Sequence, residues 1–512
     1  MAHHLAYAIP THLLMWQRVR EYAVPPSMIE TATARRAVGD WAGACAAARV
    51  DIDLDLRAAR DRYGTDLVTH LRADLRRLAP DLLRWHLPRI APDGRLRTGL
   101  TISLACYRSS GATPLHLVVR TPPARADAGQ RISLALWEES GNGAPEHHPH
   151  PHPDRRFRLD LHRHLWDAER SGELAVRCGA GGAPPMVPSA RPYALARPHA
   201  SARPDVPDRP DRPAVHDDSW ALERWAAEAE LLLRAEGRAR GAFAVRLGTR
   251  SRAVLELIAP DDSHAPTFRP VRETLPRQEV AALPMLPEAA ARVLPDLELL
   301  RAGLVATDRL HPLVATALAA FGPAASSGSG RGSGPALQPD DPHRVECQGE
   351  VHRIALRDGT LSAIDHDPAQ LRREELLVAL GGPASACLRA IDEIHRDPEA
   401  LPAVRERLGH GDVAGALAVV EGLLGSGAVL RDGPLREELE SAAARRIDHG
   451  LFRSGLVAVH PGAGGAAGGR DAELRPADAG HRPRLDRRTP SAVRLKQSSR
   501  ARPRTGLKLS TG

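Results

Sequence analysis

Lysine is almost missing from this chain of 512 residues, since it occurs only at Lys496 and Lys508 while arginine supplies the remaining basic side chains. A phosphate-binding loop that ends in Gly-Lys-Ser/Thr is therefore excluded. The His-Glu-x-x-His zinc-protease pattern, the Gly-x-Ser-x-Gly nucleophile elbow and the Gly-x-Gly-x-x-Gly dinucleotide fingerprint are missing too. These absences lower the expectation of catalysis without removing it.

Cysteine and long apolar runs are also scarce. The five cysteines stand singly, with no Cys-x-x-Cys pair, at Cys45, Cys106, Cys178, Cys347 and Cys387. The first residues lack the basic region and apolar stretch of a signal peptide, so we expect reduced thiols and a cytoplasmic location. No run approaches the ~18 apolar residues that cross a bilayer, so we expect no membrane insertion.

Aromatic residues make up only 3% of the chain, although 42% of the residues are apolar and 26% are charged. The cores must therefore be built from Ala, Leu and Val, which favours helices that approach closely. The length is typical of about three to four domains. The use of Arg, Ala, Gly and Pro is typical of a high-GC bacterial genome.

The order of patterns predicts a multidomain α+β protein. It has a helical N-terminal part, a small antiparallel β domain, an α+β middle domain, and a mainly helical C-terminal domain with a β-hairpin. The expected boundaries are 12–93 (helical), 97–178 (β-rich, with a His/Pro insert), 179–218 (Pro/Arg-rich linker), 219–321 (α+β), 322–341 (Gly/Ser linker), 342–458 (hairpin and helices) and 459–512 (disordered basic tail).

One short stretch occurs twice, as Gly39-Asp40-Trp41-Ala42-Gly43-Ala44 and again as Gly411-Asp412-Val413-Ala414-Gly415-Ala416. We expect each to be the corner of a helical hairpin, where the first Gly ends one helix and Asp caps the next. The first copy resembles half of a tetratricopeptide-type hairpin. Arg35 and Asp51 depart from that consensus, and the copies are much farther apart than its ~34-residue period, so we favour convergent corner chemistry over the alternative of a degraded repeat.

Several runs alternate with the period of a strand. Val50 to Leu56 alternates apolar residues with Asp51, Asp53 and Asp55; the glycine and glutamate of a calcium loop are missing there, so we expect a strand edge or a helix lead-in. The β domain is predicted to contain strands at Leu100 to Tyr107, Leu115 to Arg120, Ile132 to Trp137 and Phe157 to Leu161.

The C-terminal domain is predicted to begin with a hairpin turning at Asp358-Gly359, followed by five helices. Leu376, Leu377 and Leu380 are expected in its core. His343, Cys347 and His352 are weighed as metal ligands or as a Cys/His nucleophile pair. Read as one strand, Cys347 and His352 fall on opposite faces, which argues against catalysis.

The only dense group of candidate metal ligands lies between His147 and His164, where six histidines occur within eighteen residues. Neutral imidazoles bind zinc, so a zinc site is an alternative to a plain linker here. Alternating prolines point the rings in different directions and argue for the linker. The candidate ligands are His148, His150, His152, His162 and His164.

The net charge of +7 is concentrated in the last residues. The segment from His481 to Gly512 contains ten Arg or Lys residues and one Asp, so the rest of the chain has a slightly negative net charge. Such a tail is able to bind polyanions without sequence preference. The candidate contacts are Arg482, Arg484, Arg487, Arg488, Arg500, Arg502 and Arg504.

Taken together, the patterns favour a non-catalytic cytoplasmic scaffold or adaptor that needs no cofactor and binds other proteins through helical surfaces. The first alternative is a metal-binding sensor or metal-dependent hydrolase centred on residues 147–164. The second is nucleic-acid binding through the basic tail.

Overall fold

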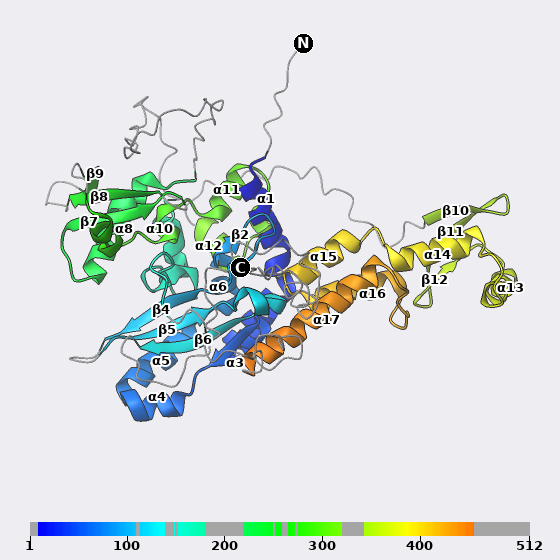
Figure 1. Ribbon diagram of the computed structural model, residues 1–512, viewed down its shortest axis with the longest axis horizontal. Coiled ribbons are helices and arrows are strands. Elements are labelled where there is room, and N and C mark those ends of the chain that lie inside the picture. Colours follow the sequence, from blue (N-terminus) through cyan, green and yellow to red (C-terminus); the bar gives the residue numbers. More distant parts are fainter. Residues whose placement is uncertain are drawn as a thin grey trace, which may run out of the picture. The chain divides into compact units, whose positions relative to one another are not determined.

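The computed structural model describes residues 9–108, 113–138, 148, 152–179, 219–248, 251–258, 265–271, 275–319 and 343–454. The expected tail and nearly all of the two expected linkers lie outside these residues. The described chain is α+β with several small sheets, which confirms the predicted fold class (Figure 1). It forms two compact units: residues 1–154 with 326–512, and residues 155–325.

The first unit begins with short helices packed by an apolar stripe. In α5 (Thr65–Arg77), Val68, Leu71 and Leu75 recur at helical spacing and are buried, as are Leu82 and Trp85 in α6 (Pro80–His86). The helices are α1 (Thr11–Arg18), the π-helical η1 (Val19–Ala23), α2 (Pro26–Ala37), α3 (Trp41–Ala47), α4 (Leu56–Tyr63), α5 (Thr65–Arg77) and α6 (Pro80–His86).

A four-stranded sheet follows, in the order β1 (Val50–Asp53), β6 (Ile132–Glu138), β5 (Leu115–Arg120) and β4 (Thr101–Tyr107). Figure 1 shows β4, β5 and β6 as adjacent arrows. β1 runs parallel to β6, with Val50 opposite Ile132, and the other pairs are antiparallel. The division into units therefore differs from the boundaries expected from the sequence, because a strand of the helical segment belongs to this sheet.

Short elements connect these strands: the pair β2 (Arg89–Ile90) and β3 (Arg95–Leu96), and the 3-10 turns η2 (Ala124–Ala126) and η3 (Ala128–Gln130). Of the strands predicted for the β domain, three are confirmed. Phe157 to Leu161 is not a strand: it includes the 3-10 helix η4 (Leu159–Leu161) and belongs to the second unit.

The C-terminal part of the first unit has the predicted hairpin and five helices. Asp358 and Gly359 both have positive φ, as a two-residue hairpin turn requires. The hydrophobic core of this C-terminal part includes Ile354, Leu361, Ile391, Val404 and Leu424. The elements are β10 (His343–Cys347), β11 (Glu350–Arg357), β12 (Thr360–Ala363), α13 (Pro368–Ala379), α14 (Ala386–Arg396), α15 (Leu401–Gly409), α16 (Val413–Leu424) and α17 (Pro434–Arg453).

In the second unit, α8 (Trp225–Ala235) packs against an antiparallel sheet of β7 (Gly241–Arg246), β8 (Arg252–Ile258) and β9 (Thr267–Pro270). β7 and β8 form an antiparallel hairpin, and Trp225 lies in the core. The remaining elements are η5 (Arg163–Leu165), η6 (Ser171–Glu173), α7 (Leu174–Arg177), η7 (Leu222–Arg224), α9 (Arg277–Ala282), α10 (Glu288–Ala291), α11 (Pro295–Arg301), η8 (Thr307–Arg309) and α12 (Pro312–Ala319).

Candidate functional site

Both repeated Gly-Asp stretches form the predicted helical corners. Gly39 and Gly411 have φ values of +78° and +82°, the left-handed conformation that glycine adopts without strain. Asp40 accepts a hydrogen bond from the backbone amide of Gly43 at 2.8 Å, and Asp412 accepts one from Gly415 at 3.2 Å. The same residues thus end one helix and cap the next at two places in the first unit.

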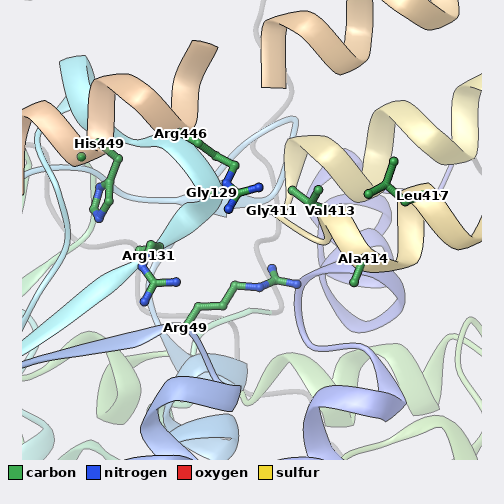
Figure 2. A pocket seen from close by; sticks show the side chains of 10 residues that line it. Arg49, Gly129, Arg131, Gly411, Val413, Ala414, Leu417, Arg446 and His449 are labelled. Carbon is green, nitrogen blue, oxygen red and sulfur yellow. The ribbon is translucent and has the colours of Figure 1, made fainter. Parts of the chain in front are cut away.

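The second corner lines a pocket of about 600 Å³ in the first unit (Figure 2). The pocket lies where the start of β6 meets α16 and α17. Glycines allow two backbone segments, around Gly129 and Gly411, to approach closely there. A Cβ atom on Gly411 would stand 2.1 Å from the carbonyl oxygen of Gly129. The basic side chains of the wall are Arg49, Arg131, Arg446 and His449.

Two of these cations are neutralised by carboxylates. Arg49, which is 15% exposed, donates to Oδ1 of Asp412 at 3.2 Å. Arg131 donates through Nε to both carboxylate oxygens of Asp51, at 3.1 and 3.2 Å. The pocket is therefore less positive than its arginines alone suggest.

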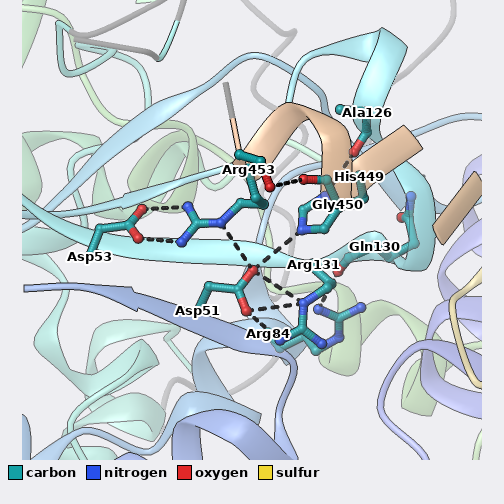
Figure 3. Close-up of polar contacts among 10 residues, drawn as sticks. Asp51, Asp53, Arg84, Ala126, Gln130, Arg131, His449, Gly450 and Arg453 are labelled. Carbon is teal, nitrogen blue, oxygen red and sulfur yellow. Dashed lines mark hydrogen bonds and ion pairs between the residues drawn. The ribbon is translucent and has the colours of Figure 1, made fainter. Parts of the chain in front are cut away.

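Asp51 is the centre of a network that joins β1 to α17 (Figure 3). Besides Arg131, its carboxylate faces His449 Nε2 at 3.3 Å and Arg453 Nε at 3.8 Å. Burial acts to raise the pKa of Asp51, but the hydrogen bonds from His449 and Arg131 and the positive charges of Arg131 and Arg453 outweigh it and hold the pKa well below its usual range. Asp53, on the same strand, pairs with Arg453.

In this network, His449 is not placed to act as a general base. The second nitrogen of His449, Nδ1, faces the carbonyl oxygen of Ala126 at 3.2 Å, so both ring nitrogens already have oxygen partners. A general base needs a free nitrogen toward its substrate. The contacts instead hold β1 and the chain around the start of β6 against α17.

A second polar group lies close to the pocket. His410, the residue before Gly411, is buried, and neither ring nitrogen has a hydrogen-bond partner among the described residues. Burial, followed by the positive charges of Arg89 and Arg84 and of other nearby arginines, lowers the pKa of His410 to about 3. The ring is therefore neutral near pH 7.

Cys347, His366 and Cys387 converge in the C-terminal part, although they are far apart in sequence. Their possible ligand atoms all lie within 4.8 Å of one another, and all three residues are buried. The ring of His352 lies 4.4 Å from that of His366, measured between centroids, and is buried as well.

The expectation that Cys347 and His352 fall on opposite faces was wrong. Gln348 and Gly349 both have positive φ and form a tight turn between β10 and β11, so the two residues belong to different strands. In the antiparallel register, Val345 lies opposite His352 and Cys347 lies two residues further along the same face. A hairpin thus brings them together where a single strand would separate them.

The same cluster is unsuited to nucleophilic catalysis. Burial raises the pKa of the Cys387 thiol to about 12, helped by its hydrogen bond and charge interaction with Cys347 and by the negative charges of Glu374 and Asp365. A nucleophilic cysteine needs the opposite, a lowered pKa. Thiol and imidazole groups at this distance are instead suited to hold a soft metal ion.

Helix α13 also differs from its prediction. Leu376, Leu377 and Leu380 were expected in the core, but they are 61%, 51% and 86% exposed. The reason is that α14, not α13, covers the three-stranded sheet, with Cys387 and Ile391 pointing inward.

The histidines predicted as ligands are placed in different units. His162 and His164 lie in the second unit, with ring centroids 5.8 Å apart. His162 Nδ1 faces the carbonyl oxygen of Arg158 at 2.9 Å, and Nε2 faces Glu228 at 3.2 Å. Because both nitrogens have partners, binding an ion at His162 would require breaking one of these contacts.

The remaining residues predicted as metal ligands or polyanion contacts either have other contacts or lie outside the described residues. His148, in the first unit, contacts the carbonyl oxygen of Thr121 at 2.9 Å, and the ring of His152 packs edge-on against Trp137. His150 and the arginines of the tail lie outside the described residues. A metal site in the segment 147–164 stays a prediction.

Within the described part of the chain, no helix combines the length and apolar character needed to cross a bilayer. Comparison of the chain with family models, curated proteins and solved structures finds no match. The function must therefore be inferred from the residues themselves.

Proposed function

We propose that the protein is a non-catalytic bacterial adaptor that binds another protein through its helical surfaces, with α13 as the main contact. The observation that supports this is the exposure of Leu376 and Leu377 on α13, which has no buried residue, and of Leu380 directly after the helix. Apolar side chains gathered on a surface are typical of binding sites. The five cysteines are free, which fits the reducing cytoplasm that we propose as its location.

The proposed occupant of α13 is an amphipathic helix or groove of a partner protein. Burying three leucines supplies about 5 kcal/mol before the entropic cost of association is subtracted. Arg372, Arg373, Glu374 and Glu375 place both charge signs beside the leucines. They favour a partner with mixed charge at the rim and disfavour a polyanion or an anionic membrane.

The test compares two double variants of the full chain. Leu376→Glu with Leu380→Glu places charges on α13, while Val429→Glu with Ile447→Glu does the same at exposed apolar positions elsewhere. A photo-crosslinking residue at position 373 identifies the partner in cells of the source bacterium, and calorimetry with the purified partner measures affinity. We expect the α13 variant to bind at least about tenfold more weakly and the control to stay within about twofold.

Two results would overturn the proposal. One is equal binding of the partner by both double variants. The other is light scattering that shows a dimer as the only complex formed through α13, because α13 would then serve self-association.

A further inference from the structure

We infer that Cys347, His352, His366 and Cys387 form a structural zinc site in the C-terminal part of the first unit. The inference goes beyond the proposed adaptor function and does not depend on it. It starts from the convergence of three buried residues whose ligand atoms lie within 4.8 Å of one another, with a fourth buried ring adjacent to them.

The fold brings these residues together from four positions. Cys347 ends β10, His352 lies on the facing strand β11, His366 follows β12, and Cys387 is in the first turn of α14. Cys347 and Cys387 form a small buried cluster with Ala363, separate from the larger apolar core of this part. A metal ion here would tie the hairpin to α14 at the place where few apolar side chains do so.

The chemistry of the set suits zinc. Two cysteines and two histidines are a common donor set of structural zinc sites, and soft thiolates disfavour calcium and magnesium. Zinc binding releases the two thiol protons to solvent and forms two Zn–S bonds and two Zn–N bonds. The two thiolates balance the charge of Zn²⁺, so the buried site carries no net charge.

One contact orients a ligand ring. His366 Nδ1 lies 3.4 Å from the carbonyl oxygen of Asp367, and the tautomer that donates its hydrogen there has the lone pair on Nε2 for the ion. Such a partner on the second nitrogen is usual for histidine ligands. Tetrahedral coordination places donor atoms about 3.3–3.8 Å apart, so the cluster contracts by about 1 Å when it binds.

The first experiment uses the untagged wild-type full chain. We expect about one zinc per chain by elemental mass spectrometry after dialysis. After chelation, cobalt should bind with the same stoichiometry and produce a thiolate-to-cobalt charge-transfer band that added zinc removes. A chain that holds less than about 0.1 zinc and yields no such band overturns the inference, as does a Cys347–Cys387 disulfide found by intact mass.

The second experiment assigns the ligands. Cys387→Ser and His366→Ala should lose the zinc, and His352→Ala should weaken its retention against a chelator by at least about tenfold. Cys106→Ser and the double change His162→Ala with His164→Ala are the controls and should retain it. Zinc retained by Cys387→Ser but lost from the His162 and His164 double variant would place the ion elsewhere and overturn the assignment. If the cysteine variants do not fold, the cobalt spectrum of the wild type decides alone.

Discussion

The guanidinium of Arg49 donates to Asp412 across 3.2 Å and so joins the residue before β1 to the cap of α16. A second hydrogen bond, of 2.9 Å, runs from Arg49 to the carbonyl oxygen of His410. Asp412 also caps α16 and accepts from Arg407 at 3.0 Å. One carboxylate thus serves as helix cap and as partner of two arginines, whereas Asp40, at the other corner, contacts only the exposed Arg35 among the arginines described.

Asp412→Ala should therefore cost more stability than Asp40→Ala. Each change removes a helix cap, which contributes about 1 kcal/mol. Only Asp412→Ala also leaves a largely buried arginine without its carboxylate, for a total of about 3–4 kcal/mol. Urea unfolding gives the free energies, and hydrogen exchange of α16 and α3 locates the losses. Equal losses in the two variants would show that the Arg49 contact contributes little.

The two corner glycines provide a second matched pair. At Gly39 an added Cβ atom meets nothing within 4 Å, so Gly39→Ala should lose only about 1 kcal/mol from its left-handed backbone. At Gly411 the Cβ atom would overlap the backbone of Gly129, so Gly411→Ala should lose about 3 kcal/mol or more. The melting temperatures of both variants test this difference in stability. Similar values would contradict the close approach of the backbone segments around Gly129 and Gly411.

Features coded by neighbouring residues were predictable from the sequence. The Gly-Asp corners and the turn at Asp358-Gly359 depend on φ preferences and on side chains two or three residues away. The strand at Val50 and the cap by Asp55, which accepts from the amides of Arg57 and Ala58, are equally local. Such signals act before the chain has any tertiary structure, so they can be seen in isolation.

Features that depend on distant partners were missed. The apolar residues of α13 look like those of a core helix, and only the packing of α14 on the sheet leaves them exposed. Cys347 and His352 share a face because Gln348 adopts a positive φ, which is uncommon for a residue with a side chain. Cys387 joins them only through the tertiary fold. Gly349 was the one local signal from which the hairpin of β10 and β11 could have been predicted.

Stability should fall in mild acid because of His410. Its folded pKa of about 3 lies below the unfolded value of about 6.5, so between these values the unfolded chain binds one more proton. The free energy of unfolding should therefore fall as the pH decreases from about 6.5, by up to about 1.4 kcal/mol per unit.

His410→Leu removes this titration and should flatten the profile. At pH 7 it should not destabilise, because it replaces a ring whose nitrogens lack hydrogen bonds within the described chain. His410→Gln is the control. It should flatten the profile too, but at pH 7 it should be less stable than His410→Leu, because it keeps a buried polar group at this position. Urea unfolding from pH 4 to 8 measures both, and an unchanged slope in His410→Leu would contradict the lowered pKa.

Asp51 should contribute stability at neutral pH and lose it only in stronger acid. Its folded pKa is depressed, so its contribution is present above the unfolded value of about 3.9 and disappears as the pH falls toward the folded value. Asp51→Asn should cost about 2 kcal/mol at pH 7, because Arg131 and His449 lose a charged partner. Asp53→Asn, which affects the half-exposed pair with Arg453, should cost less than about 1 kcal/mol. Urea unfolding at pH 7 and pH 3 compares them, and the gap between wild type and Asp51→Asn should narrow at the lower pH; a gap that widens would mean that the carboxylate is destabilised by its burial.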